Sequence, residues 1–291
     1  MKKYSAIFKS TGKSKKFDLN LDLLEKSEEI QLVSRKRRFD TVHEYIDCVN
    51  QNKIPLVVNA GIPEKIKYEI LSTLIAEKTS DQLKSIPVHL LCTSGTTGTG
   101  SRPKTFSFSL KTSLANAEAH NQSLGLLGGE KVLFPLPMTH SFGVVIGILG
   151  SLCLNSETFL LESDEGVQKI CDLLGETQFD VLYLTPSLAR QLSQYLKRID
   201  QKIISPRKIS IGSSKLVYED IKNLKTIFSD SEFYFTYGLT EMGPRVSTFK
   251  IIEIGEGPLP IGNPIIGVSW RVDGTLKIKS DYAALGLRDD F

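Results

Sequence analysis

Short apolar segments alternate with helix-like segments along most of this chain, and no other feature constrains its fold as strongly. Strands separated by helices of roughly ten residues run mostly parallel, because each helix carries the chain back across the sheet before the next strand begins. The sequence therefore predicts an α/β fold in which mostly parallel sheets are covered by helices on both faces. The expected strands are residues 86–92, 132–136, 158–161, 181–184, 208–211 and 232–236, and the expected helices are residues 113–127, 142–154, 167–174, 187–196 and 218–228.

The alternation stops after Pro258, where a different signal begins. Two segments, residues 268–272 and 275–279, flank the dipeptide Asp273-Gly274, and Asp-Gly in this position strongly favours a tight β-hairpin. We therefore expect an antiparallel β subdomain to start here. The predicted organisation has three parts: a reduced first α/β subdomain in residues 1–125, a second α/β subdomain in residues 126–255, and the start of a β-barrel-like subdomain in residues 256–291.

The charge balance excludes a function that depends on a strong overall electrostatic field. The 291 residues include 36 Lys+Arg and 33 Asp+Glu, which gives a formal net charge of +3. Such a chain has no general attraction for nucleic acid or for an anionic membrane. The basic run Arg35-Lys36-Arg37-Arg38 leaves nucleic-acid binding open as an alternative. No aromatic platform accompanies this run, so a solvated surface turn is the favoured interpretation.

Neither the cysteines nor the apolar stretches indicate a secreted or membrane protein. The four cysteines, Cys48, Cys92, Cys153 and Cys171, form no CxxC pair and are expected to be reduced thiols. The basic start of the chain has too short an apolar stretch for a secretory signal. The longest span without a charged residue, 132–156, is interrupted by prolines and polar residues and does not suit a membrane helix. We expect a cytoplasmic protein.

A loop rich in glycine and hydroxyl side chains follows the expected strand 86–92, at the end of the strand where parallel sheets bind ligands. Three glycines and six Ser or Thr residues occupy positions 93–101, and Arg102 and Lys104 follow. Backbone N–H groups, hydroxyls and cations of this kind surround phosphate groups, although composition alone also fits a flexible polar loop. The loop is not a Walker motif, because no Gly-Lys-Ser/Thr follows, and Pro103 replaces the third glycine of a GxGxxG motif.

The sequence Thr-Ser-Gly-Thr-Thr-Gly at residues 93–98, followed by Pro103-Lys104, resembles the phosphate loop of the adenylate-forming superfamily. This superfamily comprises acyl- and aryl-CoA synthetases, adenylation domains of peptide synthetases and luciferases. Further segments resemble its other motifs in the same order along the chain. They are the proline-rich residues 134–143 with a gating histidine, the adenine-lining residues 212–216, the sequence Tyr-Gly-Leu-Thr-Glu at 237–241, and residues 261–264 and 285–287 at the approach to a third subdomain.

This resemblance implies a site for ATP and Mg²⁺. The loop with Lys104 would hold the β- and γ-phosphates, Tyr237 would offer a flat face to adenine, and Thr240 would contact the α-phosphate. Glu241 would supply an oxygen ligand to Mg²⁺. Gly238 would leave room for the carboxyl group of the acid. The expected nucleotide-binding residues are Thr93, Ser94, Gly95, Thr96, Thr97, Gly98, Gly212, Ser213, Ser214, Tyr237, Gly238 and Thr240, and the expected catalytic residues are Lys104, His140, Thr240 and Glu241.

The implied activity is that of the large N-terminal domain of an acid–AMP ligase. Such an enzyme activates a small carboxylic acid as an acyl-adenylate and passes the acyl group to the thiol of CoA or of a phosphopantetheinyl carrier protein. His140 would swing between capping the acid pocket and admitting the thiol. The other histidines match no motif. Candidates for the walls of the acid pocket are Tyr183, Thr185, Ser213, Thr236 and Met242.

Three departures from the family pattern leave other functions open. Four residues, 99–102, lengthen the phosphate loop, so Arg102 is a candidate to share the role of Lys104. The first subdomain is short, and residues 1–40 have no clear counterpart. The mobile C-terminal domain of the family, whose lysine bridges the acid and the α-phosphate, is expected to lie outside this chain. The alternatives are therefore a non-catalytic protein that binds nucleotide or acyl-adenylate, and one subunit of a split ligase completed by a separate protein.

Overall fold

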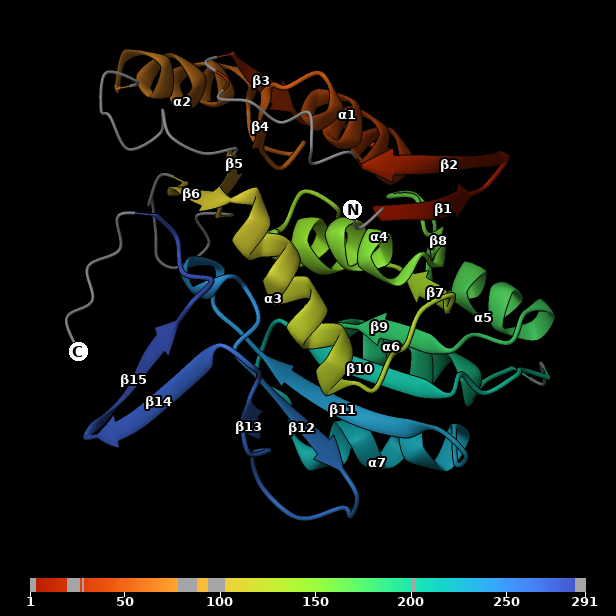
Figure 1. The fold of residues 1–291 in the computed structure, drawn as a ribbon. Helices are drawn as coiled ribbons and strands as arrows, with labels where there is room; N and C mark the ends of the chain where they lie inside the picture. Colours follow the sequence, from red (N-terminus) through yellow and green to blue (C-terminus); the bar gives the residue numbers. More distant parts are fainter. Residues whose placement is uncertain are drawn as a thin grey trace.

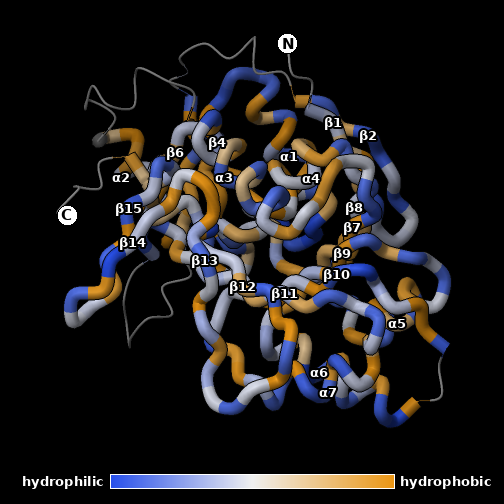
Figure 2. The backbone as a smooth tube through the Cα atoms, turned by 60° about the horizontal axis from the view of Figure 1, so that its bottom comes forward, coloured by the Kyte–Doolittle hydropathy of each residue, from blue (hydrophilic) through white to orange (hydrophobic). Residues whose placement is uncertain are grey.

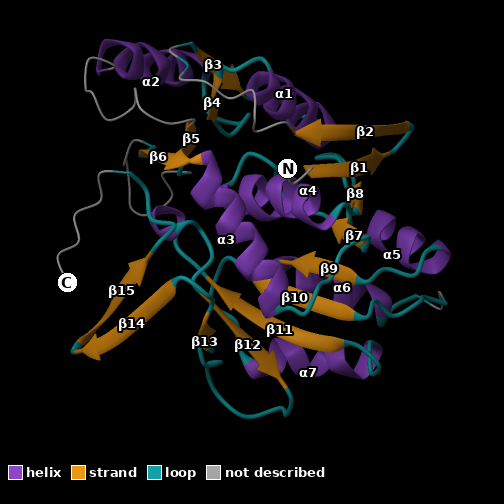
Figure 3. Ribbon diagram, in the orientation of Figure 1, coloured by secondary structure: helices purple, strands orange, loops and turns teal. Residues whose placement is uncertain are grey.

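The computed structural model describes residues 4–19, 27, 29–77, 88–93, 103–199 and 202–285. These residues form two β-sheets, the helices that pack on them, and a two-stranded hairpin near the C-terminal end (Figure 1, Figure 3). The architecture confirms the predicted α/β class. Within the described residues, every helix is too short or too polar to pass through a bilayer.

The larger sheet has nine strands in the order β13-β12-β11-β10-β9-β7-β8-β1-β2. Strands β11, β10, β9, β7, β8 and β1 are parallel, whereas antiparallel pairing occurs at both edges. The carboxyl ends of the parallel strands therefore lie side by side, where open α/β sheets bind ligands. The bounds are β1 (Tyr4–Ser10), β2 (Lys13–Leu19), β7 (Lys131–Phe134), β8 (Glu157–Leu160), β9 (Val181–Leu184), β10 (Lys208–Gly212), β11 (Glu232–Tyr237), β12 (Ser247–Ile251) and β13 (Asn263–Pro264).

The smaller sheet has four strands in the order β3-β4-β5-β6, in which β3, β4 and β5 are parallel and β6 is antiparallel to β5. Figure 1 shows it above the larger sheet, together with helices α1 and α2. Strand β5 ends where the glycine-rich loop begins, and β6 starts where this loop ends. The bounds are β3 (Ile30–Val33), α1 (Arg38–Asn50), β4 (Ile54–Val57), α2 (Glu64–Glu77), β5 (Val88–Cys92) and β6 (Thr105–Ser109).

Apolar side chains alternate between the two faces of the larger sheet and are buried by different helices. In β9, Val181 and Tyr183 belong to the core with α3, the π-helix and α4, whereas Leu182 and Leu184 belong to the core with α5, α6 and α7. Burial on both faces explains why this strand is a continuous apolar run. The bounds are α3 (Leu110–Ser123), the π-helix Gly143–Gly150, α4 (Ser151–Leu154), α5 (Val167–Glu176), α6 (Pro186–Leu196) and α7 (Tyr218–Ile227).

Strands β14 (Val268–Asp273) and β15 (Thr275–Ser280) form the antiparallel hairpin that Asp273-Gly274 predicts. Gly274 has φ +65°, a left-handed conformation that glycine adopts without steric cost. After the hairpin, Ala284 N–H donates to the Glu241 carbonyl at 2.9 Å. Leu285 N–H donates to the Ser107 carbonyl of β6 at 2.8 Å. This segment therefore joins the two sheets beside the loop that follows β11.

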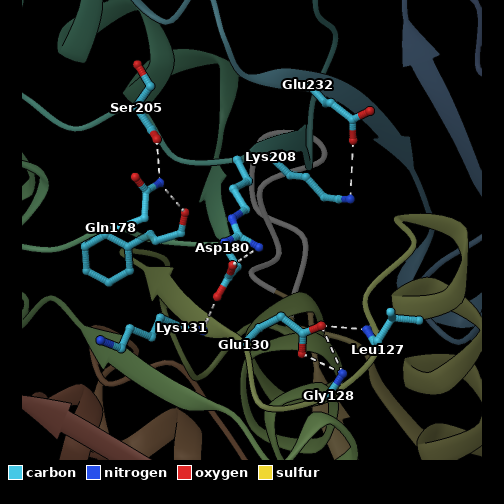
Figure 4. Close-up of polar contacts among 11 residues, drawn as sticks. Leu127, Gly128, Glu130, Lys131, Gln178, Asp180, Ser205, Lys208 and Glu232 are labelled. Atoms are coloured by element: carbon cyan, nitrogen blue, oxygen red, sulfur yellow. Dashed lines mark hydrogen bonds and ion pairs between the residues drawn. The ribbon is translucent and has the colours of Figure 1, made fainter.

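Polar contacts fasten the amino ends of several parallel strands of the larger sheet (Figure 4). The Asp180 carboxylate accepts from the Lys131 N–H at 2.9 Å, and the Lys208 ammonium lies 3.3 Å from the Glu232 carboxylate. The Glu130 carboxylate accepts from the backbone of Gly128. These contacts hold the starts of the strands in place relative to one another.

The structure differs from the expected elements in several places, including the following. Residues 4–19, grouped by the sequence with the first subdomain, form β1 and β2 at the edge of the larger sheet, because β1 pairs with β8. Figure 2 shows the hydrophilic residues of β2 along the outside of that edge. The apolar helix expected at 142–154 winds first as a π-helix, and strands β6 and β12 were not expected. The three-part division of the chain remains a prediction.

Candidate functional site

The described parts of the predicted motifs follow the carboxyl ends of strands in the two sheets. Thr93 follows β5 of the smaller sheet, and His140 lies in the loop after β7. Gly212 ends β10 and Tyr237 ends β11, and these strands are neighbours with Gly212 opposite Thr236. The pairing of β10 with β11 therefore brings the motifs at Gly212 and Tyr237 together.

The base of the glycine-rich loop is closed by a pair of hydrogen bonds. Thr93 N–H donates to the Lys104 carbonyl at 2.8 Å, and Lys104 N–H donates to Thr93 Oγ1 at 3.1 Å. The Lys104 side chain is exposed, as a phosphate-binding cation requires. The other predicted loop residues lie outside the described part of the chain, and they are Ser94, Gly95, Thr96, Thr97, Gly98 and Arg102.

The Glu241 carboxylate lies close enough to Tyr237 for its negative charge to affect the ionisation of the tyrosine hydroxyl. Burial raises the pKa of Tyr237, and the nearby Glu241 carboxylate raises it further. The ring is only half-buried, which leaves part of a flat aromatic face accessible. The Glu241 carboxylate is partly exposed and makes no hydrogen bond or ion pair with the described residues. A carboxylate that has no partner among the described residues fits a hard divalent cation such as Mg²⁺.

Thr240 connects this loop to the loop that holds the histidine. Its hydroxyl lies 2.9 Å from the hydroxyl of Ser141, although 99 positions separate the two residues. Thr240 begins a short 3₁₀ helix, Thr240–Met242, directly after the Tyr237-Gly238 strand end. The hydrogen bond holds the two predicted motif loops side by side.

His140 is held in one neutral form by the start of the following helix. Its Nδ1 accepts from the Phe142 N–H at 3.2 Å, so Nε2 carries the proton. The Val144 N–H donates to the His140 carbonyl at 2.9 Å, which begins the helical winding. Burial lowers the pKa of His140, and the positive charge of Arg245 lowers it further. The histidine is therefore uncharged at neutral pH.

Gly212 and the two serines after it form a tight turn at the end of β10. A Cβ at Gly212 would lie 2.5 Å from Thr236 Oγ1, so this position has no room for a side chain. Ser213 has φ +81°, which turns the chain sharply, and Ser213 and Ser214 are exposed. The turn lies next to the end of β11, as the predicted adenine-lining role requires.

The space beside Gly238 is occupied by the chain itself. A Cβ built at Gly238 would lie 1.8 Å from the Pro244 carbonyl oxygen and 2.8 Å from Nη2 of Arg245. Arg245 is only 2% exposed, and sequence reasoning did not identify it. The only sequence signal that could have pointed to Arg245 is its position four residues after Glu241. The residue type gives none, since arginine side chains are rarely buried.

A pocket of about 310 Å³ lies on another side of the histidine loop. Its walls combine the basic run with the loop after β4 and the loop after β7. Nη1 of Arg38 is buried and has no hydrogen-bond partner among the described residues. Arg35, Lys36 and Arg37 are exposed, as expected of a solvated surface turn, and three residues of the run, Arg35, Lys36 and Arg38, also line this pocket. The lining residues are Arg35, Lys36, Arg38, Thr41, Asn59, Ala60, Gly61, Pro137, Met138, Thr139 and Ser163.

The two histidines outside the motifs that are fully buried have structural partners. His89 lies between the Tyr45 hydroxyl at 3.0 Å and the Ser113 hydroxyl at 2.8 Å. His120 Nε2 lies 3.2 Å from the Tyr183 hydroxyl. In the described part of the chain, no three His, Cys, Asp or Glu side chains are grouped in the way that a metal ion held by protein ligands alone would need.

The fold is that of the large N-terminal domain of adenylate-forming enzymes. Residues 14–281 match the profile of the AMP-binding enzyme family, and the chain belongs to that family. The chain is 25% identical over 237 residues to 2-succinylbenzoate–CoA ligase of Lactococcus lactis, covering 81% of this chain and 44% of that protein. It spans less than half the length of the curated relatives it matches.

Two solved structures extend the comparison of folds. ATP-bound MatB from Rhodopseudomonas palustris superposes with a TM-score of 0.72 at 15% identity, over 97% of this chain and 68% of that one. The O-succinylbenzoate coenzyme A synthetase of Bacillus subtilis, in complex with ATP and magnesium ion, gives 0.70 at 14% identity, over 89% and 62%. At identities this low, the similarity shows that the folds are alike and nothing more.

Proposed function

We propose that this chain is the nucleotide-binding domain of an acid–AMP ligase, and that it activates a small carboxylic acid with ATP. The observation that carries the proposal is the hydrogen bond between Thr240 and Ser141, which joins the Tyr-Gly-Leu-Thr-Glu loop to the histidine loop. Both loops follow parallel strands at their carboxyl ends, the usual place for a ligand in such a sheet. Family membership supports the same reaction class.

In the proposed reaction a carboxylate oxygen of the acid attacks the α-phosphorus of ATP. The new O–P bond forms as the bond from the α-phosphorus to the bridging oxygen breaks, and pyrophosphate leaves. Lys104 and the loop after Thr93 would hold the β- and γ-phosphates, and Thr240 would donate to the α-phosphate. The partly exposed ring of Tyr237 would stack on adenine. Mg²⁺, held by Glu241, would neutralise charge that develops on the phosphates.

In the second step the thiol loses its proton to solvent and its sulfur attacks the acyl carbon; the C–S bond forms, the bond from the acyl carbon to the phosphate oxygen breaks, and AMP leaves. The neutral His140, with its proton on Nε2, would line the path of the thiol. The basic pocket beside residues 137–139 suits an acceptor that carries phosphates, which CoA and a phosphopantetheinyl carrier protein share. Because the reaction needs ATP and a reduced thiol, we assign it to the cytoplasm.

Two related functions differ from the proposed one in whether the chain catalyses pyrophosphate exchange, and in whether it needs a partner to do so. A non-catalytic relative would bind ATP without exchanging pyrophosphate, and one subunit of a split ligase would exchange it only with its partner. Acid-dependent exchange of pyrophosphate into ATP, with and without a separate C-terminal-domain protein, distinguishes the three.

Isothermal titration with ATP and Mg²⁺ tests nucleotide binding directly. We expect Glu241→Gln to weaken Mg²⁺-dependent ATP binding by about tenfold or more, because it removes the charge of the proposed metal ligand. Glu253→Gln is a matched control, since Glu253 is an exposed carboxylate after β12. Absence of ATP binding by the folded native protein, or equal weakening by both variants, would refute the proposal.

A further inference from the structure

A buried arginine connects the end of β11 with the histidine loop, the segment after β7 that carries His140. Arg245 is 2% exposed, and its Nη1 donates to Thr236 Oγ1 at 2.8 Å. Its Cζ lies 4.2 Å from the centre of the Phe142 ring, two positions after the histidine. One side chain therefore contacts both the strand that ends at Tyr237 and the segment that positions the imidazole.

The fold fixes where this guanidinium lies. The side-chain amide of Asn116 donates to the Arg245 carbonyl at 2.9 Å, and its oxygen accepts from the Arg245 N–H at 3.1 Å. Cβ atoms built at Gly212 and Gly238 would lie 3.2 Å from Nη1 and 2.8 Å from Nη2, so the chain leaves no room there even for a methyl group. A side chain enclosed in this way acts on its neighbours in the chain rather than on a substrate.

Phe142 relates the position of Arg245 to the imidazole of His140. The Phe142 N–H donates to His140 Nδ1 at 3.2 Å, and the Phe142 side chain is itself 2% exposed. Nδ1 accepts this bond only while it carries no proton, so the bond selects the neutral imidazole with its proton on Nε2. A contact that holds Phe142 in place therefore also holds the ring of His140 and decides which nitrogen is protonated.

The positive charge of Arg245 favours the same form of the imidazole. Burial lowers the pKa of His140, and the charge of Arg245 lowers it further; in the described part of the chain no other charged group shifts it. Burial lowers the pKa of Arg245 itself to about 10, so the guanidinium stays charged at neutral pH. A protonated His140 would lose its bond from Phe142 and would lie near a second cation, and both effects oppose protonation.

Packing alone does not account for an arginine at this position. Removing a guanidinium from water costs free energy unless the group is paired and fully hydrogen-bonded, and an apolar side chain of similar size avoids this cost. Among the described residues, no carboxylate forms an ion pair with Arg245, and its Nε has no hydrogen-bond partner. The cation–π contact with Phe142 offsets only part of the cost. A contribution to stability therefore does not explain the charge.

We propose that Arg245 is a positioning residue for the thiol step: it ties the histidine loop to the end of β11 and holds His140 as a neutral imidazole with its proton on Nε2. The inference rests on the proposed ligase function and adds a residue to it. Nδ1 is occupied by the Phe142 N–H, whereas Nε2–H has no hydrogen-bond partner among the described residues. It is the group that can donate to the thiolate sulfur as the sulfur attacks the acyl carbon.

Nuclear magnetic resonance of the histidine ring nitrogens tests the inference in the native chain, without nucleotide or Mg²⁺. Native protein and its variants are produced with isotope-labelled histidine, and His140→Gln assigns the signal. We expect native His140 to be neutral at neutral pH with its proton on Nε2. In Arg245→Met its pKa should rise and the preference for Nε2 should weaken, whereas Arg245→Lys should stay near native because the positive charge remains. Arg198→Met, at an exposed arginine, is the control and should leave the signal unchanged.

A second measurement follows the thiol step. Acetate, valerate and benzoate are screened for pyrophosphate exchange, which reports the first step, and thioester formation with CoA is measured for each acid that exchanges. In Arg245→Met we expect the rate of thioester formation to fall about tenfold more than the rate of exchange. As the pH falls from about 8 to 6, this rate should also drop more steeply than in the native protein, because His140 gains a proton. Arg245→Lys should recover most of the native profile.

The outcomes separate this inference from the function on which it rests. If the folded native protein does not bind ATP and Mg²⁺, the ligase function falls, and the thiol step falls with it. If the nucleotide binds, an unchanged His140 signal in folded Arg245→Met overturns the role of Arg245 alone. Equal losses of exchange and of thioester formation, with an unchanged pH profile, have the same consequence, because they indicate a merely structural role. Arg245→Gln is the second neutral variant if Arg245→Met does not fold, and thermal unfolding shows which variants are folded.

Discussion

The hydroxyl of Ser141 lies 2.9 Å from the hydroxyl of Thr240, and this contact joins two loops that follow different strands of the larger sheet. Ser141 is almost fully buried at the start of the helical segment that follows His140. Any shift of the histidine loop is therefore transmitted to the residue expected to contact the α-phosphate. The hydrogen bond therefore links the positions of the two loops.

Ser141→Ala should separate these loops with a measurable loss of stability. The substitution removes one partly buried hydrogen bond, which corresponds to about 1 kcal/mol of the free energy of unfolding. We also expect weaker binding of ATP, because Thr240 loses the partner that orients its hydroxyl. Urea unfolding and calorimetric titration measure the two effects. Ser229→Ala, at an exposed serine, should change neither, and identical behaviour of the two variants would contradict the coupling.

Gly238→Ala should be strongly destabilising. The added Cβ would lie 1.8 Å from the Pro244 carbonyl oxygen, and backbone cannot move aside as a flexible side chain can. We expect a decrease of roughly 2–4 kcal/mol in the free energy of unfolding. Gly166→Ala is the matched control, since a Cβ there meets nothing within 4 Å. Equal stability of the two variants would show that the space beside Gly238 adapts easily.

The sequence alone was sufficient to predict those elements whose signals lie in neighbouring residues. The strand Val181–Leu184 is an isolated apolar run, and its predicted bounds are those of β9. Helix α6 begins at Pro186 after Thr185, whose hydroxyl accepts from the Leu188 N–H at 3.2 Å. The Asp273-Gly274 hairpin was likewise predicted from two residues and their flanks.

Features that depend on distant partners could not be predicted in this way. Strand β2 contains Lys13, Lys15 and Lys16 and resembles solvated surface, and β1 joins the sheet through β8, far along the chain. Arg245 looks like one more surface charge until the fold buries it. The order of the motifs predicted where the candidate site lies, but the burial of Arg245 could be found only from the three-dimensional structure.

The protein should lose stability as the pH falls below neutral. Burial lowers the pKa of His89 to about 3 and that of His120 well below its ordinary value. The unfolded chain therefore binds protons first, and stability is lost as the pH falls below about 6.5. Each of these histidines should contribute about 1 kcal/mol of loss between pH 6.5 and 5.5. Urea unfolding across this range measures the slope.

The variant His89→Gln tests the origin of this pH dependence. Glutamine does not titrate, so the loss of stability between pH 6.5 and 5.5 should decrease by the share of one histidine. The variant is compared with itself at the two pH values, because its stability at neutral pH also reflects the changed contacts with Tyr45 and Ser113. A slope equal to that of the native protein would mean that His89 does not contribute.

Phe17→Ala should show that the N-terminal hairpin is part of the core. The Phe17 ring is 4% exposed and packs edge-on against Phe8 and Phe39, with centroid distances of 5.8 and 6.1 Å. Its loss should lower the free energy of unfolding by about 3–5 kcal/mol. Ile7→Ala, on the exposed face of the same hairpin, should cost much less. Similar losses for both variants would mean that Phe17 is not a core residue.

Thr93→Val should weaken ATP binding without a large effect on folding. The hydroxyl of Thr93 accepts from the Lys104 N–H at 3.1 Å, whereas the backbone bond from Thr93 N–H to the Lys104 carbonyl does not need the side chain. Valine has the same shape but cannot accept, so the base of the loop stays closed by one bond only. We expect the Kd for ATP with Mg²⁺ to rise about three- to tenfold, the equivalent of one hydrogen bond.

Thr226→Val, on the exposed face of α7, should leave the Kd unchanged. A native Kd in Thr93→Val would mean that the second bond does not position Lys104, and an increase of several hundredfold would mean that the Thr93 hydroxyl itself contacts the nucleotide.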